Sequence, residues 1–238
     1  MKYNIIAITG KSAAGIDRIL REIVEMNNEN INIIFPTPSR PKRDYEIEGW
    51  DYYFIDETEF FKRRAYNQFI ECTVHREWIY GVEFQNLNPC KVNVGAFNPI
   101  AIKQLAERTD VNLTIFQIEA KDKTRLLRQL NREEDPDCQE IVRRYNSDCF
   151  DFSSFDYNYP NIKIKNETEE DLVAALGIIL QKAEDLAPFG QNWLNELNKN
   201  LNIVEYPSKD TPHLDFYMEV FIYVCNNKRW NTSIIWSK

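Results

Sequence analysis

Two glycines, at positions 10 and 15, lie between an apolar run and a run with helical periodicity. The stretch reads ITGKSAAGIDRIL over residues 8–20. Glycines at this spacing between a strand and a helix are typical of a phosphate-binding loop, whose backbone N–H groups cradle phosphate oxygens. Such a loop continues with Lys and then Ser or Thr, but here Ile16 and Asp17 follow. The spacing predicts the loop and leaves its chemistry open.

Five residues of this stretch could still contact a nucleotide. Lys11 could turn its amine toward phosphates, although a surface lysine on a bent loop is the alternative. The N–H groups from Ser12 to Ile16 would form an anion nest. Asp17 could hold Mg²⁺ directly or through water, because hard oxygen ligands suit this ion. The predicted nucleotide contacts are therefore Gly10, Lys11, Ser12, Gly15 and Asp17, with Asp17 as the metal ligand.

A second candidate site follows a Pro-rich turn. Arg40 and Arg43 are three residues apart, and Tyr52 lies close behind them. Two guanidinium groups at this spacing can fork onto a monophosphate, and a tyrosine hydroxyl adds a donor. An exposed basic loop stiffened by proline is the alternative interpretation.

The rest of the chain must position these two sites. Apolar periodicity predicts strands at 3–8, 32–35, 91–94, 113–120 and 162–165, and helices at 16–26, 56–64, 99–108, 121–132, 141–152 and 167–186. Strand–helix alternation of this kind implies a parallel sheet covered on both faces. Residues 50–82 read as a small β-rich insertion. Beyond residue 190, a helix at 191–201 and a strand at 216–224 do not continue the alternation.

Composition limits the class of protein. The chain has 238 residues and a net charge of −8, which argues against general nucleic-acid binding. Five cysteines without a C-x-x-C pair indicate reduced structural thiols. Its apolar runs are too short for a membrane span, and the N-terminus lacks a signal-peptide pattern. We therefore expect a cytoplasmic protein.

The segment SRPKRDYEIEGWDYYF, residues 39–54, resembles the monophosphate-binding signature of guanylate kinases, which are P-loop nucleoside monophosphate kinases. The positions that fit are Arg40, Arg43, Glu46, Gly49, Asp51, Tyr52 and Phe54. The resemblance covers about residues 3–184. It implies an α/β, P-loop NTPase-type three-layer fold over residues 1–188 with a central parallel sheet. It also implies a β-rich monophosphate-binding insertion at 36–83 and a helical lid at 128–144.

The same resemblance assigns further substrate contacts. In NQFIECTVHREWIYGV, Glu71 matches the carboxylate that accepts hydrogen bonds from guanine, and Tyr80 matches a phosphate-contacting tyrosine. Ser39 stands where the family usually has Thr. Val82 replaces a hydroxyl residue that contacts the base in the family. The acceptor could therefore be a monophosphate other than GMP.

The lid and the last strand complete the implied site. Arg128, Arg132 and Arg143 match the arginines that clamp the transferring phosphoryl group. Asn166 matches the residue beside the donor's adenine, although Asn is also an ordinary helix cap.

The departures fall on the donor and metal side. Ile16 replaces the lysine that bridges the β- and γ-phosphates, and it cannot supply an ammonium group. Asn93 and Gly95 are placed at the two acidic positions that follow the third parallel strand in the family.

Two functions remain open from the sequence. The first is a kinase that transfers a phosphoryl group from ATP, with Mg²⁺, to GMP, dGMP or a related monophosphate, with turnover weakened by Ile16. The second is an inactive guanylate kinase-like module that binds a nucleotide or a phosphorylated partner, as related domains of membrane-associated scaffold proteins do. Residues 189–238 form an extension that could bind a protein partner.

Overall fold

The computed structural model describes residues 2–187 except 43–45, 50–51, 76 and 133. The expected helix at 191–201 and strand at 216–224, and with them the extension at 189–238, lie outside these residues. Arg43 and Asp51 lie outside them too.

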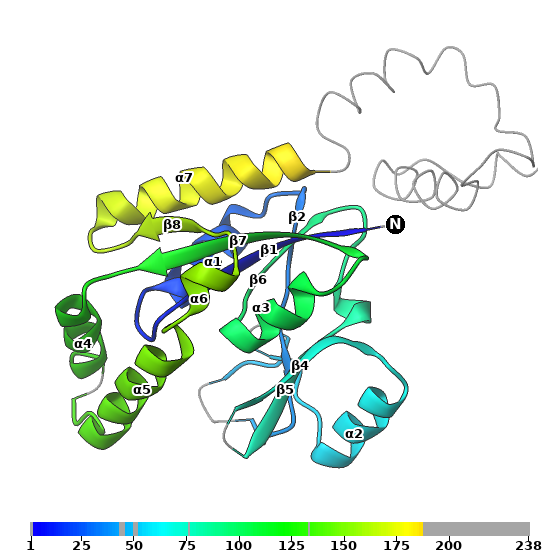
Figure 1. Ribbon diagram of the computed structural model, residues 1–238, viewed down its shortest axis with the longest axis horizontal. Coiled ribbons are helices and arrows are strands. Elements are labelled where there is room, and N and C mark those ends of the chain that lie inside the picture. Colours follow the sequence, from blue (N-terminus) through cyan, green and yellow to red (C-terminus); the bar gives the residue numbers. More distant parts are fainter. Residues whose placement is uncertain (1, 43–45, 50–51, 76, 133, 188–238) are drawn as a thin grey trace, which may run out of the picture. The chain divides into compact units, whose positions relative to one another are not determined.

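Five parallel strands form the central sheet in the order β2-β6-β1-β7-β8 (Figure 1). Their bounds are β1 Tyr3–Gly10, β2 Ile31–Ile33, β6 Val92–Ala96, β7 Val111–Glu119 and β8 Ile162–Lys165. β1 lies in the middle and pairs with β6 on one side and β7 on the other. The predicted parallel sheet is confirmed.

Alternate residues of β1 enter the two halves of the core. Ile6 and Ile8 pack toward helices α1 (Ile16–Met26) and α7 (Glu169–Leu186). Ile5 and Ala7 pack toward α3 (Pro99–Ala106). All four side chains are fully buried, as expected for a strand that is covered on both faces. This gives the three-layer architecture that the sequence predicts.

A three-stranded antiparallel sheet with the order β3-β5-β4 follows β2 in the chain. It consists of β3 (Thr37–Pro38), β4 (Phe69–His75) and β5 (Trp78–Glu83), and helix α2 (Glu57–Ala65) precedes β4. Ile70 and Val82 join the core cluster on the α3 side, so the small sheet rests against the large one. A 3₁₀ turn, η1 (Phe84–Asn86), leads back to β6.

Helices α4 (Asp122–Leu130) and α5 (Cys138–Asp151) stand beyond the carboxyl end of the sheet (Figure 1). α5 begins three residues earlier than the periodicity predicts, because the Asp137 side chain caps it by accepting from Glu140 N. A short helix, α6 (Phe155–Asn158), was not predicted. Thr168 and Asp171 form the capping box of α7, so Thr168 and not Asn166 caps this helix. Within the described residues, no helix is both long and apolar enough to cross a membrane.

Candidate functional site

The loop between β1 and α1 needs glycine at both of its ends. A Cβ on Gly10 would stand 2.5 Å from the carbonyl oxygen of Ile118. Gly15 has φ +103°, in the left-handed region that favours glycine, and a Cβ there would collide with the Asn166 amide. The two glycines therefore serve close packing of the loop against β7 and the segment after β8.

Two of the predicted ligand-contacting residues, Asn166 and Arg128, donate hydrogen bonds to backbone carbonyls of this loop. Asn166 is buried, and its Nδ2 donates to Ala14 O at 2.8 Å. Arg128 donates to Ala13 O and Ala14 O at 3.2 Å each and to Asn166 O at 3.0 Å. In this conformation both side chains bind loop and strand-end carbonyls. Their predicted roles, adenine contact and phosphoryl clamp, stay predictions.

The other two predicted lid arginines do not share these contacts. Arg143 is exposed and bonds Glu140 of its own helix at 2.7 and 3.0 Å. Arg132 is exposed just beyond the end of α4. Within the described residues, Arg128 is therefore the one of the three whose side chain contacts the loop.

Arg125 and Asp148 contact the loop, and the sequence analysis missed both. Asp148 accepts from Ser12 N at 2.9 Å and from Ser12 Oγ at 3.0 Å. Arg125 binds Asp148 and donates to Ser12 O at 2.9 Å. Arg125 precedes Arg128 by three residues, so helical spacing places both on one face of α4. No comparable local signal identifies Asp148.

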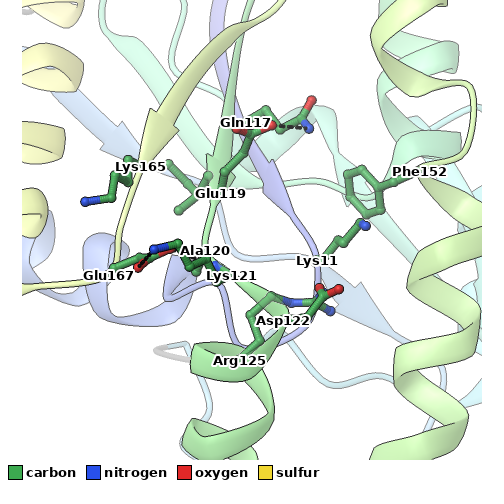
Figure 2. Close-up of a pocket in the computed structure, with 11 residues that line it drawn as sticks. Lys11, Gln117, Glu119, Ala120, Lys121, Asp122, Arg125, Phe152, Lys165 and Glu167 are labelled. Carbon is green, nitrogen blue, oxygen red and sulfur yellow. Dashed lines mark hydrogen bonds and ion pairs between the residues drawn. The ribbon is translucent and has the colours of Figure 1, made fainter.

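A cavity of about 510 Å³ opens where β7 and β8 end. Lys11, at the end of β1, and Arg125 lie on its wall opposite Lys165 and Glu167 (Figure 2). Lys11 is close enough to Asp122 to contribute to lowering the pKa of that carboxyl, after the Tyr145 hydroxyl and Arg125. The Lys11 amine therefore lies in a region that also holds carboxylates.

Arg40 stands at the centre of the predicted monophosphate site. It is 5% exposed and donates to Glu46 at 2.7 and 2.5 Å and to the Tyr80 hydroxyl at 3.0 Å. Its guanidinium carbon also lies 5.0 Å from the ring centre of Tyr52. Together with a bond to Pro41 O, these contacts use four of its five donors within the described residues. Glu46 thus orients a cation that keeps one N–H for a ligand.

Ser39 ties this site to β5. Its backbone N donates to Ile79 O at 2.8 Å, and its hydroxyl accepts from Ile79 N at 3.0 Å. The residue is buried, so its predicted substrate contact would have to use the remaining hydroxyl hydrogen.

Glu71 is a buried carboxylate whose Oε2 lacks a hydrogen-bond partner within the described residues. Burial raises the pKa of this carboxyl to about 8. Gln104 and Arg64 line a cavity of about 360 Å³ beside it. An orphaned buried acceptor is costly unless a ligand or water satisfies it, which fits the predicted contact with a base.

Two neighbours of Glu71 on the small sheet are Val82 and Thr73. Val82 pairs with Glu71 across the strands, but its side chain is buried in the core on the α3 side. Thr73 supplies a hydroxyl two residues further along β4 and accepts from Asn98 Nδ2 at 3.1 Å. Thr73 thus places a hydroxyl on the same face of β4 as Glu71.

Asn93 does not lie at the carboxyl end of β6, so its placement at an acidic metal-side position was wrong. It pairs with Ile5, three residues before the strand ends at Ala96. Its side chain is fully buried and bonds Asn32, Asn88 and Asn4 O. Asn93 is a structural amide that links β1, β2 and β6.

Asp17 is the carboxylate nearest to the start of α1. It is exposed in the first helical turn, and its charge adds to the burial that raises the pKa of Tyr52. The described residues contain no group of three His, Cys, Asp or Glu side chains that could enclose a metal ion. One carboxylate together with nucleotide phosphates fits Mg²⁺, which keeps most of its waters.

Comparison with known proteins agrees with this geometry. The model of the guanylate kinase family matches residues 2–183. A guanylate kinase from Wigglesworthia glossinidia brevipalpis is 30% identical over 165 residues, 67% of this chain and 74% of that protein. One from Thermotoga maritima is 36% identical over 81 residues, but the match covers only 34% of this chain and 39% of that protein.

A solved structure supports the fold. The guanylate kinase from Anaplasma phagocytophilum superposes with a TM-score of 0.51 at 21% identity, covering 86% of this chain and 98% of that one. The region matched by the family model includes the two-glycine loop, the small sheet and both helices beyond the main sheet. The chain belongs to the guanylate kinase family.

Proposed function

We propose that this protein binds GMP, dGMP or a related monophosphate at the Arg40 site and transfers a phosphoryl group to it from ATP, slowly for want of a lysine at position 16. One observation carries the proposal: Arg40 bonds Tyr80 of the small sheet, and the same sheet carries Glu71, a buried carboxylate with one oxygen that lacks a partner within the described residues. Arg40 bonds Tyr80, which pairs across the strands with Thr73. Glu71 lies two residues from Thr73 on β4, so the two side chains point to the same face of the sheet. Their positions on the strand are about 7 Å apart.

A cation and a carboxylate acceptor on one small sheet suit a nucleoside monophosphate. The phosphate would receive donors from Arg40, Tyr52 and Tyr80, with Arg43 beyond the described residues. Ionised Glu71 would accept from guanine N1–H and its exocyclic amine. Adenine offers no such pair of donors, so Glu71 would discriminate between the two bases.

For transfer, an oxygen of the acceptor phosphate attacks the γ-phosphorus of ATP, and the bond to the β–γ bridging oxygen breaks. The backbone N–H groups at the start of α1 would bind donor phosphates. Arg128, Arg132, Arg143 and Lys11 are the cations available to balance the charge that develops on the transferring group. Mg²⁺, held by Asp17 and the phosphates, would supply further charge neutralisation.

A coupled assay with ATP, Mg²⁺ and each monophosphate tests this function. Turnover with GMP or dGMP that is lost in Arg40→Ala is expected. Calorimetry should show that the same variant binds GMP at least about tenfold more weakly, because a charged contact to phosphate is lost. Guanosine, which lacks the phosphate, should bind wild type and variant equally.

An inactive binding module is the second candidate, favoured by Ile16 and by the Asp148 carboxylate on Ser12. Tight GMP binding without turnover for any monophosphate would select it. Absence of binding to any monophosphate would contradict the kinase and would restrict the binding module to a phosphorylated partner.

A further inference from the structure

The backbone and side chain of Ser12 are already bound within the chain. Asp148 lies on α5 and is 8% exposed. It accepts hydrogen bonds from the Ser12 N–H at 2.9 Å and from the Ser12 hydroxyl at 3.0 Å. These are the kinds of donor that a phosphate-binding loop offers to a phosphate oxygen. The Asp148 carboxylate thus occupies the place at Ser12 that a phosphate oxygen would take.

Arg125 fixes that carboxylate in place. Its side chain is 1% exposed and binds Asp148 through Nη2, Asp122 through Nη1 at 2.8 Å and Ser12 O through Nε at 2.9 Å. Arg125 and Asp148 together hold the N–H, the hydroxyl and the carbonyl of one loop residue. A buried pair with this many contacts is costly to disrupt by removal of one partner.

A phosphate group cannot share these donors with Asp148. The Ser12 N–H has a single hydrogen, and a carboxylate next to a polyphosphate adds repulsion at low dielectric. The backbone N–H groups at the start of α1 take no part in this contact, so the loop can still bind a phosphate there. A chain of phosphates that extends to Ser12 has to displace Asp148 from it.

We propose that Asp148 is an internal anion that competes with the donor's phosphate chain for Ser12, and that Arg125 is the positioning residue that keeps it there. Displacement would leave Arg125 and Lys11 facing the incoming phosphates instead of the carboxylate. The affinity of the loop for polyphosphate is therefore set by Asp148. The inference rests on the proposed role of this loop as the donor site.

The test is titration of the full chain with inorganic tripolyphosphate, without metal, by calorimetry. Asp148→Asn keeps the shape of the side chain but removes the charge, and we expect it to bind tripolyphosphate about tenfold more tightly than wild type. Asp151→Asn is the matched control, because it removes the same charge from an exposed position of the same helix. Equal affinities for wild type and Asp148→Asn would overturn the proposal, as would an equal gain in Asp151→Asn.

The Ser12 amide gives a second readout. In the ¹⁵N–¹H spectrum, tripolyphosphate should shift this amide in the wild type, and Asp148→Asn should shift it before any ligand is added. Arg125→Lys keeps the charge but cannot make all three contacts, so it should tighten tripolyphosphate binding two- to fivefold. A change in unfolding temperature with unchanged affinity would reduce Arg125 to a structural role and contradict the proposal.

The outcome is separable from that of the proposed function. GMP binding at the Arg40 site does not involve Ser12 or Asp148. Failure to bind GMP would contradict the proposed transfer to GMP. The tripolyphosphate result would not be affected by it. Absence of tripolyphosphate binding in wild type and Asp148→Asn alike would overturn the competition between Asp148 and phosphate, whatever GMP does.

Discussion

Arg40 and Glu46 form a two-pronged ion pair, with distances of 2.7 and 2.5 Å, in which both side chains are 5% exposed. Glu46 raises the pKa of Arg40, and the rings of Tyr52 and Tyr80 flank the guanidinium. The protein thus keeps a desolvated cation in a fixed orientation before any phosphate arrives. Preorganisation of this kind reduces the entropic cost of binding.

Glu46→Gln should destabilise the fold and weaken GMP binding together. Removing one partner of a buried pair leaves an uncompensated charge and costs about 3–5 kcal/mol of unfolding free energy. Urea unfolding measures the loss, and calorimetry measures the affinity. Glu25→Gln, an exposed change of equal charge on α1, should alter neither. Unchanged stability in Glu46→Gln would show that the pair does not hold Arg40.

GMP affinity should rise with pH toward the Glu71 pKa of about 8. Below that value the buried carboxyl is protonated and cannot accept from both guanine donors. Calorimetry across this range should show a rise in wild type and a flat profile in Glu71→Gln. A flat wild-type profile would contradict the base contact.

Glu71 should also make stability depend on pH. Its pKa is about 8 when folded and about 4.3 when unfolded. Between the two values the folded state binds more protons than the unfolded state, so stability falls as pH rises. The slope approaches about 1.4 kcal/mol per pH unit at most. Comparison of urea midpoints for wild type and Glu71→Gln isolates this contribution.

Gly15→Ala should destabilise the protein, whereas Gly177→Ala should not. At Gly15 the φ of +103° and the Asn166 amide both oppose a Cβ, which costs about 1–3 kcal/mol. Gly177 lies in α7 with open space around it, and alanine there should add about 0.5–1 kcal/mol through helix propensity. Thermal unfolding of the two variants checks both signs. A stable Gly15→Ala would mean that the loop relaxes easily.

Ile16→Lys should raise the rate of phosphoryl transfer from ATP to GMP by about 10²-fold if the chain is a weakened kinase. Ile16 is partly exposed at the first position of α1, so a lysine stem can follow the apolar surface and place its amine in the loop. Ile16→Met is the control without charge. The coupled assay measures both, and equal rates would show that more than the lysine is missing.

The sequence by itself determined the alternation of strands and helices, the two-glycine loop and the arginine-containing acceptor segment. These features are local: side chains that repeat every two or 3.6 residues, and donors at a fixed spacing, depend little on the rest of the chain. The same information predicted the parallel sheet. It also predicted substrate contacts at Arg40, which bonds Tyr80 of the small sheet, and at Glu71, which lies on β4 of that sheet.

Only the tertiary structure decided which side chains meet the loop. Asp148 reaches Ser12 across 136 residues of sequence, and Asn166 reaches Ala14 across 152. Asn93 has a spacing that resembles an acidic metal-side position, yet strand register places it three residues before the end of β6. Contacts between residues so far apart in the sequence depend on how helices and strands pack. Side-chain periodicity does not tell which distant residue accepts a hydrogen bond from a given donor. For that reason the sequence predicted the phosphate loop, and the fold revealed the carboxylate that lies on it.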